Sequence, residues 1–430
     1  MLASLMIGLA LWGLIALVAF LLFLFSPVGK CVRHMSIGRP APSLGSDAFL
    51  FNAAVASGGE VTYFEDRTCE ILSDNSTWFA ALTKDVEQAT RSIYISSYIW
   101  EADEVSEQFF KALAAAVGRG VSVHLLLDDF GNCLTSEKIE RFRAEGIKVK
   151  RFRPFKFGKI GFYFSRNHRR SYIFDEAVAY IGGASVSQKW FLRHSRKHTF
   201  TSYIDIMYRF SGPAVRHAVV AFGELWTAAS GEVLQFAAPE LLLERESTQN
   251  AVFLNHSPRV DIHPYTYLLW YSCMVAKKKI IICSPYVVPG EAMAELLIQK
   301  ARAGIEVTLI TQGTGEIWFV AQAGHSYYEQ FLKEGIHIYE CKGPAHLHSK
   351  VTIIDDEWTI IGSANFDIRS QRINHETVVG VQSADFASRN TAVVEGYLKN
   401  AAEIDLKKWQ RRPVLKKLLE QSLTFFSEQM

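Results

Sequence analysis

The sequence predicts an α/β protein made of two similar domains behind one apolar N-terminal segment, and three observations lead to this fold class. Residues 93–100 and 121–129 have the pattern of strands, and residues 106–117 between them have that of a helix. A short motif with the spacing H-x-(K/R)-x-x-x-x-D occurs twice, 180 residues apart. The first charged side chain is Lys30. We therefore expect two domains with mixed, largely parallel sheets flanked by helices, after one N-terminal transmembrane helix.

The apolar segment comprises residues 2–26, and about 20 apolar residues suffice to span a bilayer. A cleaved signal peptide is the alternative, but the segment is long and has neither a basic start nor a small-x-small cleavage pattern. Three basic residues, Lys30, Arg33 and Arg39, follow it. The positive-inside rule then predicts a single-pass protein of the cell (inner) membrane whose catalytic body is cytoplasmic.

Composition divides the rest of the chain. Residues 27–60 are rich in Gly, Pro, Ser and Ala and are expected to be a linker. The first domain is expected at 61–230, and a polar stretch at 231–257 is expected to connect it to the second. The second domain is expected at 258–405, where strands at 279–288 and 305–311 flank a helix at 291–302.

Residues 406–430 alternate basic residues with leucines, which is typical of a basic amphipathic helix. Such a helix either lies on anionic lipid or packs against its own domain. A second basic and aromatic segment, 151–170, precedes the first motif. It is either a membrane-facing or headgroup-binding rim, or a surface loop whose aromatic side chains are buried.

The second motif consists of His348, Lys350 and Asp355. The run VTIID behind the lysine reads as a buried strand, and residues two apart on a strand share a face, so His348 and Lys350 are expected side by side. An imidazole beside a cation suits phosphate chemistry, because the ring can attack phosphorus or carry a proton while the cation holds the anionic oxygens.

The first motif repeats this spacing with His168, Arg170 and Asp175. A repeat of this length indicates a duplicated domain rather than a solenoid. Two copies of a domain can bring two histidines face to face, so we expect both halves of one active site in a single chain.

These residues resemble the phospholipase D superfamily and, within it, the bacterial cardiolipin synthases. The motif regions are 163–190 and 343–370, and the likeness extends over most of the chain beyond about residue 50. It implies two pseudo-symmetric phospholipase D-type domains. It also implies that one histidine forms a phosphohistidine while the other donates a proton to the departing alcohol, with no metal and no cofactor. Which histidine is the nucleophile stays open.

The resemblance further implies roles around the histidines. Glu376 is expected to orient His348, and Asp205 is expected to orient His168. Asp175 and Asp355 are expected to be structural within their motifs. Arg170 stands where the family has lysine, and it and Lys350 would stabilise the phosphoryl oxygens. Three further residues are expected to bind the substrate phosphate: Ser185 (where the family usually has asparagine), Ser363 and Asn365.

Three functions remain open at this point. The first is a phosphatidyltransferase that converts two phosphatidylglycerols, or a related anionic phospholipid, into cardiolipin and glycerol at the membrane bilayer. The second is a phospholipase D or nuclease that hydrolyses the same type of bond. The third is a membrane scaffold with a decayed site. The net charge of +2 gives no signal for nucleic-acid binding, so no nucleic acid is expected as a partner.

Overall fold

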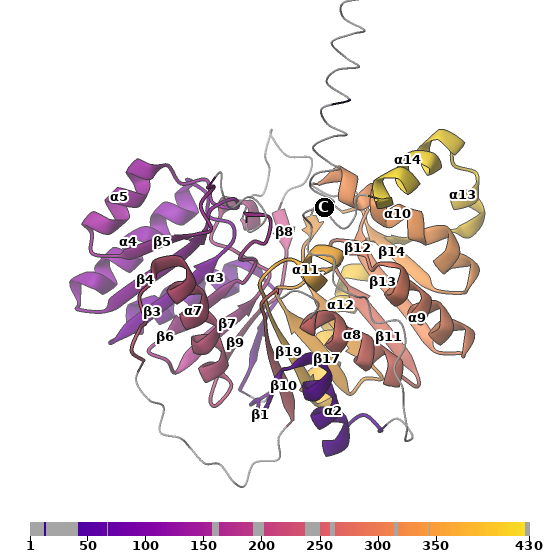
Figure 1. Ribbon diagram of the computed structural model, residues 1–430, viewed down its shortest axis with the longest axis horizontal. Coiled ribbons are helices and arrows are strands. Elements are labelled where there is room, and N and C mark those ends of the chain that lie inside the picture. Colours follow the sequence, from indigo (N-terminus) through magenta and orange to yellow (C-terminus); the bar gives the residue numbers. More distant parts are fainter. Residues whose placement is uncertain are drawn as a thin grey trace, which may run out of the picture.

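The computed structural model describes Gly13 and residues 42–425, apart from residues 67, 157–162, 192–201, 237–249, 259–262, 314–316 and 344. Two α/β lobes lie side by side, each built around one sheet (Figure 1). The first sheet has seven strands in the order β2-β9-β7-β6-β3-β4-β5. These are β2 (Glu70–Leu72), β9 (Met207–Ser211), β7 (Val178–Gly182), β6 (Ser171–Phe174), β3 (Ser92–Ser97), β4 (Ser122–Asp128) and β5 (Lys148–Phe152).

The second sheet has nine strands in the order β1-β10-β19-β17-β16-β11-β13-β14-β20. These are β1 (Glu60–Thr62), β10 (Ala251–His256), β19 (Glu376–Gln382), β17 (Trp358–Gly362), β16 (Val351–Ile354), β11 (Lys279–Cys283), β13 (Glu306–Gln312), β14 (His337–Cys341) and β20 (Ala401–Glu403). Without the edge strands β1 and β20, both sheets have the same order and directions of strands. The duplication that the repeated motif predicts is therefore present in the fold.

The expectation of largely parallel sheets is wrong. Among the described strands of the two sheets, the parallel pairs are β3–β4 and β4–β5 in the first sheet and β11–β13 and β13–β14 in the second. The other pairs are antiparallel, including the motif hairpins β6–β7 and β16–β17. The strand–helix–strand units were recognised from the sequence, but each motif turns back on itself in a tight hairpin, which requires antiparallel pairing.

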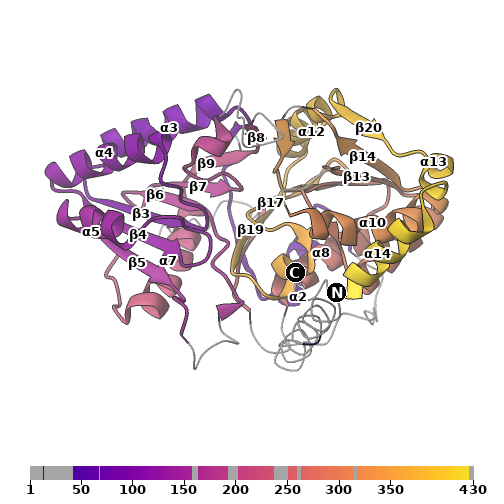
Figure 2. The same ribbon diagram turned by 90° about the horizontal axis from the view of Figure 1, so that it is seen from above.

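Helices cover both faces of each sheet (Figures 1 and 2). On the first sheet, α3, α4 and α5 cover one face and α7 the other. On the second, α2, α8, α9 and α10 cover one face and α12 the other. Their bounds are α2 (Asp47–Ser57), α3 (Asn75–Gln88), α4 (Glu104–Gly118), α5 (Ser136–Ala144), α7 (Val215–Ser230), α8 (Pro264–Val275), α9 (Glu291–Arg302), α10 (Trp318–Lys333) and α12 (Ala384–Leu398).

The two lobes share a hydrophobic core as well as having one each. Phe64 packs 5.3 Å from Phe210 of the first sheet and 5.8 Å from Phe386 of α12, measured between ring centroids. Beside them the Tyr208 hydroxyl donates to Asn390 Oδ1 at 2.6 Å. Because this core contains residues of both halves, the relative position of the lobes is fixed by close packing.

Two expected linkers contain ordered elements that belong to the second lobe. Within 27–60, helix α2 begins at the capping hydroxyl of Ser46 and ends at Gly58, whose φ of 64° is left-handed. Its Phe49, Leu50 and Ala53 are buried in the core of the second lobe. Within 231–257, residues Ala251–His256 form β10, the counterpart of β2. Small residues in α2 imitate a linker composition, which is why the sequence did not reveal the helix.

Among the described residues, no helix combines the length and the apolar character that crossing a bilayer requires. The predicted transmembrane segment, 2–26, lies outside the described residues except for Gly13.

The motif aspartates sit in the turns of the two hairpins. Asp175 and Asp355 have positive φ angles of 50° and 54°. The carboxylate of Asp355 accepts from the backbone N–H groups of residues 277, 278 and 279 at 2.8, 2.7 and 2.9 Å. Asp175 does the same with residues 90, 91 and 92. Each aspartate thus ties its hairpin to the start of the neighbouring parallel strand, in agreement with the structural role expected for it.

This arrangement predicts a difference in stability between two adjacent acids. Asp355→Ala should lower the free energy of unfolding by about 3 kcal/mol, because three backbone donors lose an ionised acceptor. Asp356→Ala should lower it by less than about 1 kcal/mol, since that carboxylate is half exposed and its ion pair, with Lys279, lies at the surface. Chemical denaturation followed by tryptophan fluorescence measures both, and equal losses would contradict the role given to Asp355.

Candidate active site

Backbone contacts between the lobes place the two motif histidines. The strand β8 (Ser202–Ile204) of the first half pairs in parallel with β15 (Ala345–Leu347) of the second. Symmetrically, Asn167 bridges to His375. These pairings continue as backbone hydrogen bonds, from His348 N–H to the carbonyl of Ile204 at 2.8 Å and from His168 N–H to the carbonyl of His375 at 3.0 Å. Each histidine therefore lies beside the residue that precedes a carboxylate of the other half.

The two histidine–carboxylate pairs cross between the halves as a result. His168 Nδ1 lies 2.8 Å from Glu376 Oε1, and His348 Nδ1 lies 2.5 Å from Asp205 Oδ2. The expected pairing, Glu376 with His348 and Asp205 with His168, is wrong. The physical reason is the register of the short contacts between the lobes, which brings each carboxylate to the histidine of the opposite lobe.

The motif cations stand against their own histidines. Arg170 Nη1 lies 3.1 Å from His168 Nε2 and donates to the His168 carbonyl at 3.0 Å. Lys350 Nζ lies 3.0 Å from His348 Nδ1 and also donates to the His348 carbonyl. Residues 348–350 precede β16 and are not part of it. Lys350 therefore lies beside His348 because its side chain reaches back to the His348 carbonyl, and not because the two residues share a face of a strand.

Burial controls the charge of this cluster. It lowers the pKa of His168 to about 4, with Arg170 acting in the same direction and Glu376 opposing it. Burial, followed by the charges of Lys350 and Arg170, holds the pKa of His348 well below its usual value. The charge of His168 contributes to this lowering, so the two imidazoles lie within electrostatic reach of each other. Both rings are neutral at pH 7 before an anionic substrate binds.

The partners of the histidines are shifted as well. Burial lowers the pKa of Lys350 to about 7, although Asp205 opposes it. Burial raises the pKa of Asp205 to about 6, with Lys350 as the main opposing charge. Burial alone would raise the pKa of Glu376. The charge and hydrogen bond of His168 and the hydrogen bond from Ser363 outweigh burial, so the pKa of this carboxyl lies below its usual value. Glu376 is thus an ionised acceptor for the imidazole of His168.

The three expected phosphate-binding residues have different surroundings. The Ser363 hydroxyl is fully buried and donates to Glu376 Oε2 at 2.5 Å, so it contacts the carboxylate that orients His168. Its expected contact with phosphate stays a prediction. The Ser185 hydroxyl is also buried and accepts from Arg170 Nε at 3.3 Å. Asn365 Oδ1 has no hydrogen-bond partner within the described residues. Of the three, Asn365 is the one that lines a cavity shared with His168.

This cavity, which we call the His168 cavity, has a volume of about 360 Å³ and draws its walls from both lobes. Its lining is largely apolar, with His168, Asn365 and Arg369 among the polar groups. An apolar cavity with a few polar groups at a reactive side chain is the usual form of a ligand site. The remaining lining residues are Tyr98, Phe130, Tyr163, Phe164, Arg166, Tyr286, Val288, Ile317, Phe319, Val320, Asp367, Ile368 and Asn374.

The residues of the basic and aromatic segment 151–170 have different roles in the structure. Tyr163 and Phe164 line the His168 cavity. Arg166 is buried, with Nε 3.0 Å from Asp128 Oδ1, and Arg169 is buried with Nη2 3.1 Å from Glu224 Oε2. Phe152 is instead buried in the core and Phe155 is exposed, so the aromatic residues of this segment do not share one role. Arg166 lines the cavity while its ion pair holds the loop, and Arg169 links the segment to α7.

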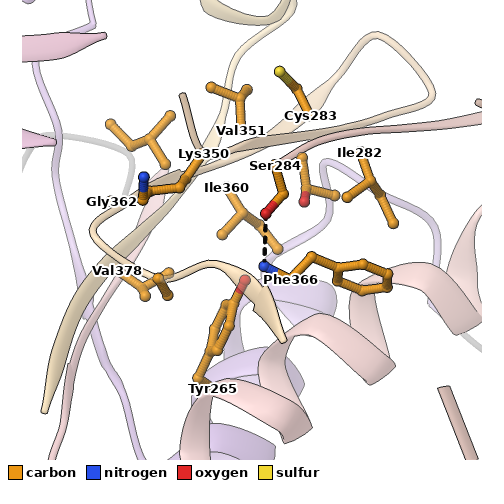
Figure 3. Close-up of a pocket in the computed structure, with 13 residues that line it drawn as sticks. Tyr265, Ile282, Cys283, Ser284, Lys350, Val351, Ile360, Gly362, Phe366 and Val378 are labelled. Carbon is orange, nitrogen blue, oxygen red and sulfur yellow. Dashed lines mark hydrogen bonds between the residues drawn. The ribbon is translucent and has the colours of Figure 1, made fainter. Parts of the chain in front are cut away.

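A second, much smaller cavity lies beneath Lys350 (Figure 3). Its volume is about 10 Å³, close to the minimum for one water molecule. Ile282, Ile360 and Val378 surround it, and the Ser284 hydroxyl at its side accepts from the Phe366 N–H at 2.9 Å. These largely apolar surroundings contribute to the burial of Lys350, and this burial lowers the pKa of its ammonium group.

Aromatic rings hold the imidazoles, and the sequence did not identify them as site residues. The ring of Tyr98 lies 4.9 Å from that of His168, and Arg170 lies 5.6 Å from the same tyrosine ring. Tyr203 lies 5.0 Å and Trp190 5.7 Å from His348. For Tyr98 a signal existed, because it follows the carboxyl end of a parallel strand, where α/β sheets place their sites.

Known proteins resemble this chain over most of its length. A family model described as "Cardiolipin synthase, PLD-like domain" matches residues 82–199 and 273–397. The chain is 26% identical over 83% of its length to a protein named cardiolipin synthase A from Wigglesworthia glossinidia brevipalpis, covering 73% of that protein. It is 27% identical over 81% of its length to cardiolipin synthase A of Pectobacterium carotovorum, covering 72% of that protein.

Solved structures share the fold. A phosphatidylserine synthase from Haemophilus influenzae superposes with a TM-score of 0.65 at 12% identity, over 89% of this chain and 100% of that one. A polyphosphate kinase from Porphyromonas gingivalis gives 0.54 at 14% identity, over 85% of this chain and 54% of that one.

The crossed pairs can be tested by nitrogen-15 NMR of the imidazoles. Glu376→Gln should shift the ring resonances of His168 and leave those of His348 nearly unchanged, because of these two histidines His168 is the one that contacts this carboxylate. Asp205→Asn should do the reverse. His168→Ala and His348→Ala assign the signals. The opposite pattern would restore the pairing expected from the sequence.

The depressed pKa of Lys350 predicts how stability depends on pH. Above about pH 7 the folded chain releases a proton that the unfolded chain keeps, so raising the pH favours folding. The free energy of unfolding of the wild type, minus that of Lys350→Met, should therefore rise between pH 7 and 9. The variant Lys111→Met, which replaces an exposed lysine of α4, is the control and should show no such rise relative to wild type. A pH-independent difference for Lys350→Met would contradict the prediction.

Proposed function

The chain belongs to the family of cardiolipin synthases with phospholipase D-like domains and is a phosphatidyltransferase, and from this premise we propose that it converts two phosphatidylglycerols into cardiolipin and glycerol. The observation that supports this proposal most directly is the crossed arrangement of the two histidines. Each imidazole has Nδ1 held by a carboxylate, which fixes the ring as in a catalytic triad and turns Nε2 of His168 toward Arg170, one of the cations that would hold the phosphate.

In the first step, Nε2 of the nucleophilic histidine attacks phosphorus, and the bond from phosphorus to the glycerol oxygen breaks. The second histidine, protonated, gives its proton to that oxygen, so that glycerol leaves and a phosphatidyl-histidine remains. In the second step the hydroxyl of the acceptor lipid loses its proton to the second histidine. Its oxygen attacks phosphorus, the phosphorus–nitrogen bond breaks, and the first histidine is regenerated.

The acid must gain a proton that the buried cluster disfavours. A phosphodiester anion bound between the histidines supplies the missing negative charge and raises both imidazole pKa values. Arg170 and Lys350 are proposed to hold its non-bridging oxygens, with Asn365 as a further donor through its amide. The proposal needs no metal and no cofactor, because the two cations perform the charge stabilisation.

We assign the nucleophile to His168. During the reaction the phosphatidyl group stays bonded to the nucleophile, so its glycerol and acyl chains must lie on the side of that histidine. The apolar His168 cavity supports this choice, because it offers such a group a space that extends from His168. His348 is then the acid and base, oriented by Asp205.

We also propose that residues 2–26 anchor the chain in the cell (inner) membrane as a single transmembrane helix, with the catalytic lobes on the cytoplasmic side. The apolar length of this segment and the basic residues behind it support the proposal.

The function is tested with the full chain in vesicles that contain labelled phosphatidylglycerol. Thin-layer chromatography should show cardiolipin and glycerol in equal amounts. The double variant His168→Ala/His348→Ala, made and reconstituted in the same way, should give neither. Phosphatidic acid as the main product would show that water is the acceptor and would contradict the transfer.

The roles of the histidines are tested by changing the leaving group. His348→Ala should lower turnover of phosphatidylglycerol by roughly 10³-fold, because the departing alkoxide loses its acid. A phosphatidyl ester of p-nitrophenol needs no such acid, so His348→Ala should still release one equivalent of nitrophenol from it. His168→Ala should release none. A burst from His168→Ala but not from His348→Ala would reverse the assignment.

A further inference from the structure

The last two helices pack on the second lobe. α13 (Leu406–Gln410) and α14 (Val414–Phe425) lie against α10 (Figure 1). Lys417 Nζ of α14 lies 3.2 Å from Glu329 Oε2 of α10, and the buried Glu420 pairs with Arg412 at 2.6 and 2.9 Å. The expected basic amphipathic helix is therefore present, and one of its faces is used for packing within its own domain.

The opposite face of α14 is apolar and points to solvent. Val414 and Leu415 are 70% and 81% exposed, and Leu418 and Leu419 are 56% and 44% exposed. Their spacing places all four on one side of the helix, which we call the α14 stripe. A surface helix of a soluble domain normally turns this kind of face inward, so the stripe calls for a partner outside the lobe.

The α14 stripe lies beside the later part of α10, whereas the start of α10 borders the His168 cavity. Lys417 lies opposite Glu329, and Glu420 lies opposite His325, at 3.6 Å. Later residues of α14 thus pass earlier residues of α10, and the helices are antiparallel. The start of α10 carries further exposed apolar side chains: Ile317, Trp318 and Phe319 are 42%, 56% and 36% exposed.

Two of these three residues belong to both surfaces. Ile317 and Phe319 are exposed, and they also line the His168 cavity. The exposed apolar surface at the start of α10 is therefore continuous with the wall of the cavity that contains the proposed nucleophile. An exposed tryptophan beside it has the amphipathic character of side chains found at the level of lipid headgroups.

The charges around the stripe are basic. Lys407, Lys408, Arg411 and Lys416 are all exposed on α13, α14 and the turn between them. Apolar side chains on one face together with lysine and arginine at its border are the features of helices that lie in the interface of an anionic membrane. A second protein chain would not require this surplus of positive charge.

We propose that the α14 stripe and Ile317–Phe319 together dock on an anionic phospholipid surface and hold the mouth of the His168 cavity against it. The purpose of this docking rests on the proposed use of phospholipid as substrate, because a lipid could then move from the bilayer into the cavity without crossing water. The contact itself does not depend on turnover and can be tested separately.

The test uses the full chain, one molecule per nanodisc, with a bimane probe at Leu418→Cys in a background where Cys31 and Cys133 are serine. Phosphatidylglycerol with brominated acyl chains should quench this probe by at least half. The matched control is Val220→Cys on α7, an apolar position with a similar exposure of 58%, and its probe should remain unquenched.

Three results would overturn the proposal. The first is a probe at Leu418 that is quenched no more than the one at Val220. The second is equal quenching in nanodiscs of brominated phosphatidylcholine, which would remove the role of anionic lipid. The third is a bimane emission that depends on protein concentration in detergent, which would identify a second copy as the partner. None of these readouts involves activity, so a failure of the proposed reaction would leave the test intact.

Discussion

The contact between the lobes at the two histidines is the constraint on which the site depends. A parallel pair of short strands, β8 and β15, and a single bridge from Asn167 to His375 fix where each lobe meets the other. A slip of one residue in either contact would turn a carboxylate away from its imidazole, because alternate residues point to opposite sides. The shared core around Phe64 holds this register. The geometry of the site in this protein therefore depends directly on how the two lobes pack.

Much of the fold could be predicted from the sequence, because its signals are local. The helix at 291–302 and the strand–helix–strand order in both halves follow from hydrophobic periodicity, and the structure places α9 at Glu291–Arg302. The aspartates of the motifs could be interpreted as structural because they follow a short buried strand. Helix α2 could not be recognised from the sequence, since it is stabilised by the burial of Phe49 and Leu50 against residues more than 200 positions away in the chain.

The crossing of the carboxylates could not be predicted for a different reason. Spacing within one half says which residues share a strand or a turn, but the partner of His168 is set by how the halves meet. Glu376 lies 208 residues from His168, and Asp205 lies 143 residues from His348. Resemblance to a family pointed to these four residues, but the pairing that it implied is the reverse of the one in the structure. Only the three-dimensional register decides that.

The two halves are similar in plan but differ in electrostatic detail. Arg170 contacts both His168 and Ser185. Lys350 contacts His348 and lies beside a small cavity with a largely apolar lining. Burial lowers the pKa of Lys350 to about 7. A guanidinium stays charged under the same burial, so the first half keeps a permanent cation beside the proposed nucleophile. The second half holds a cation whose pKa lies near neutral pH.

The most direct measurement of the central claim is a crystal structure of the full chain with vanadate, which mimics the pentacoordinate phosphorus. The account predicts vanadium bonded to Nε2 of His168, and Nε2 of His348 within hydrogen-bond distance of the opposite apical oxygen. Each Nδ1 should remain on the carboxylate of the other half. Vanadate held by one lobe alone, with the second imidazole out of reach, would contradict the account.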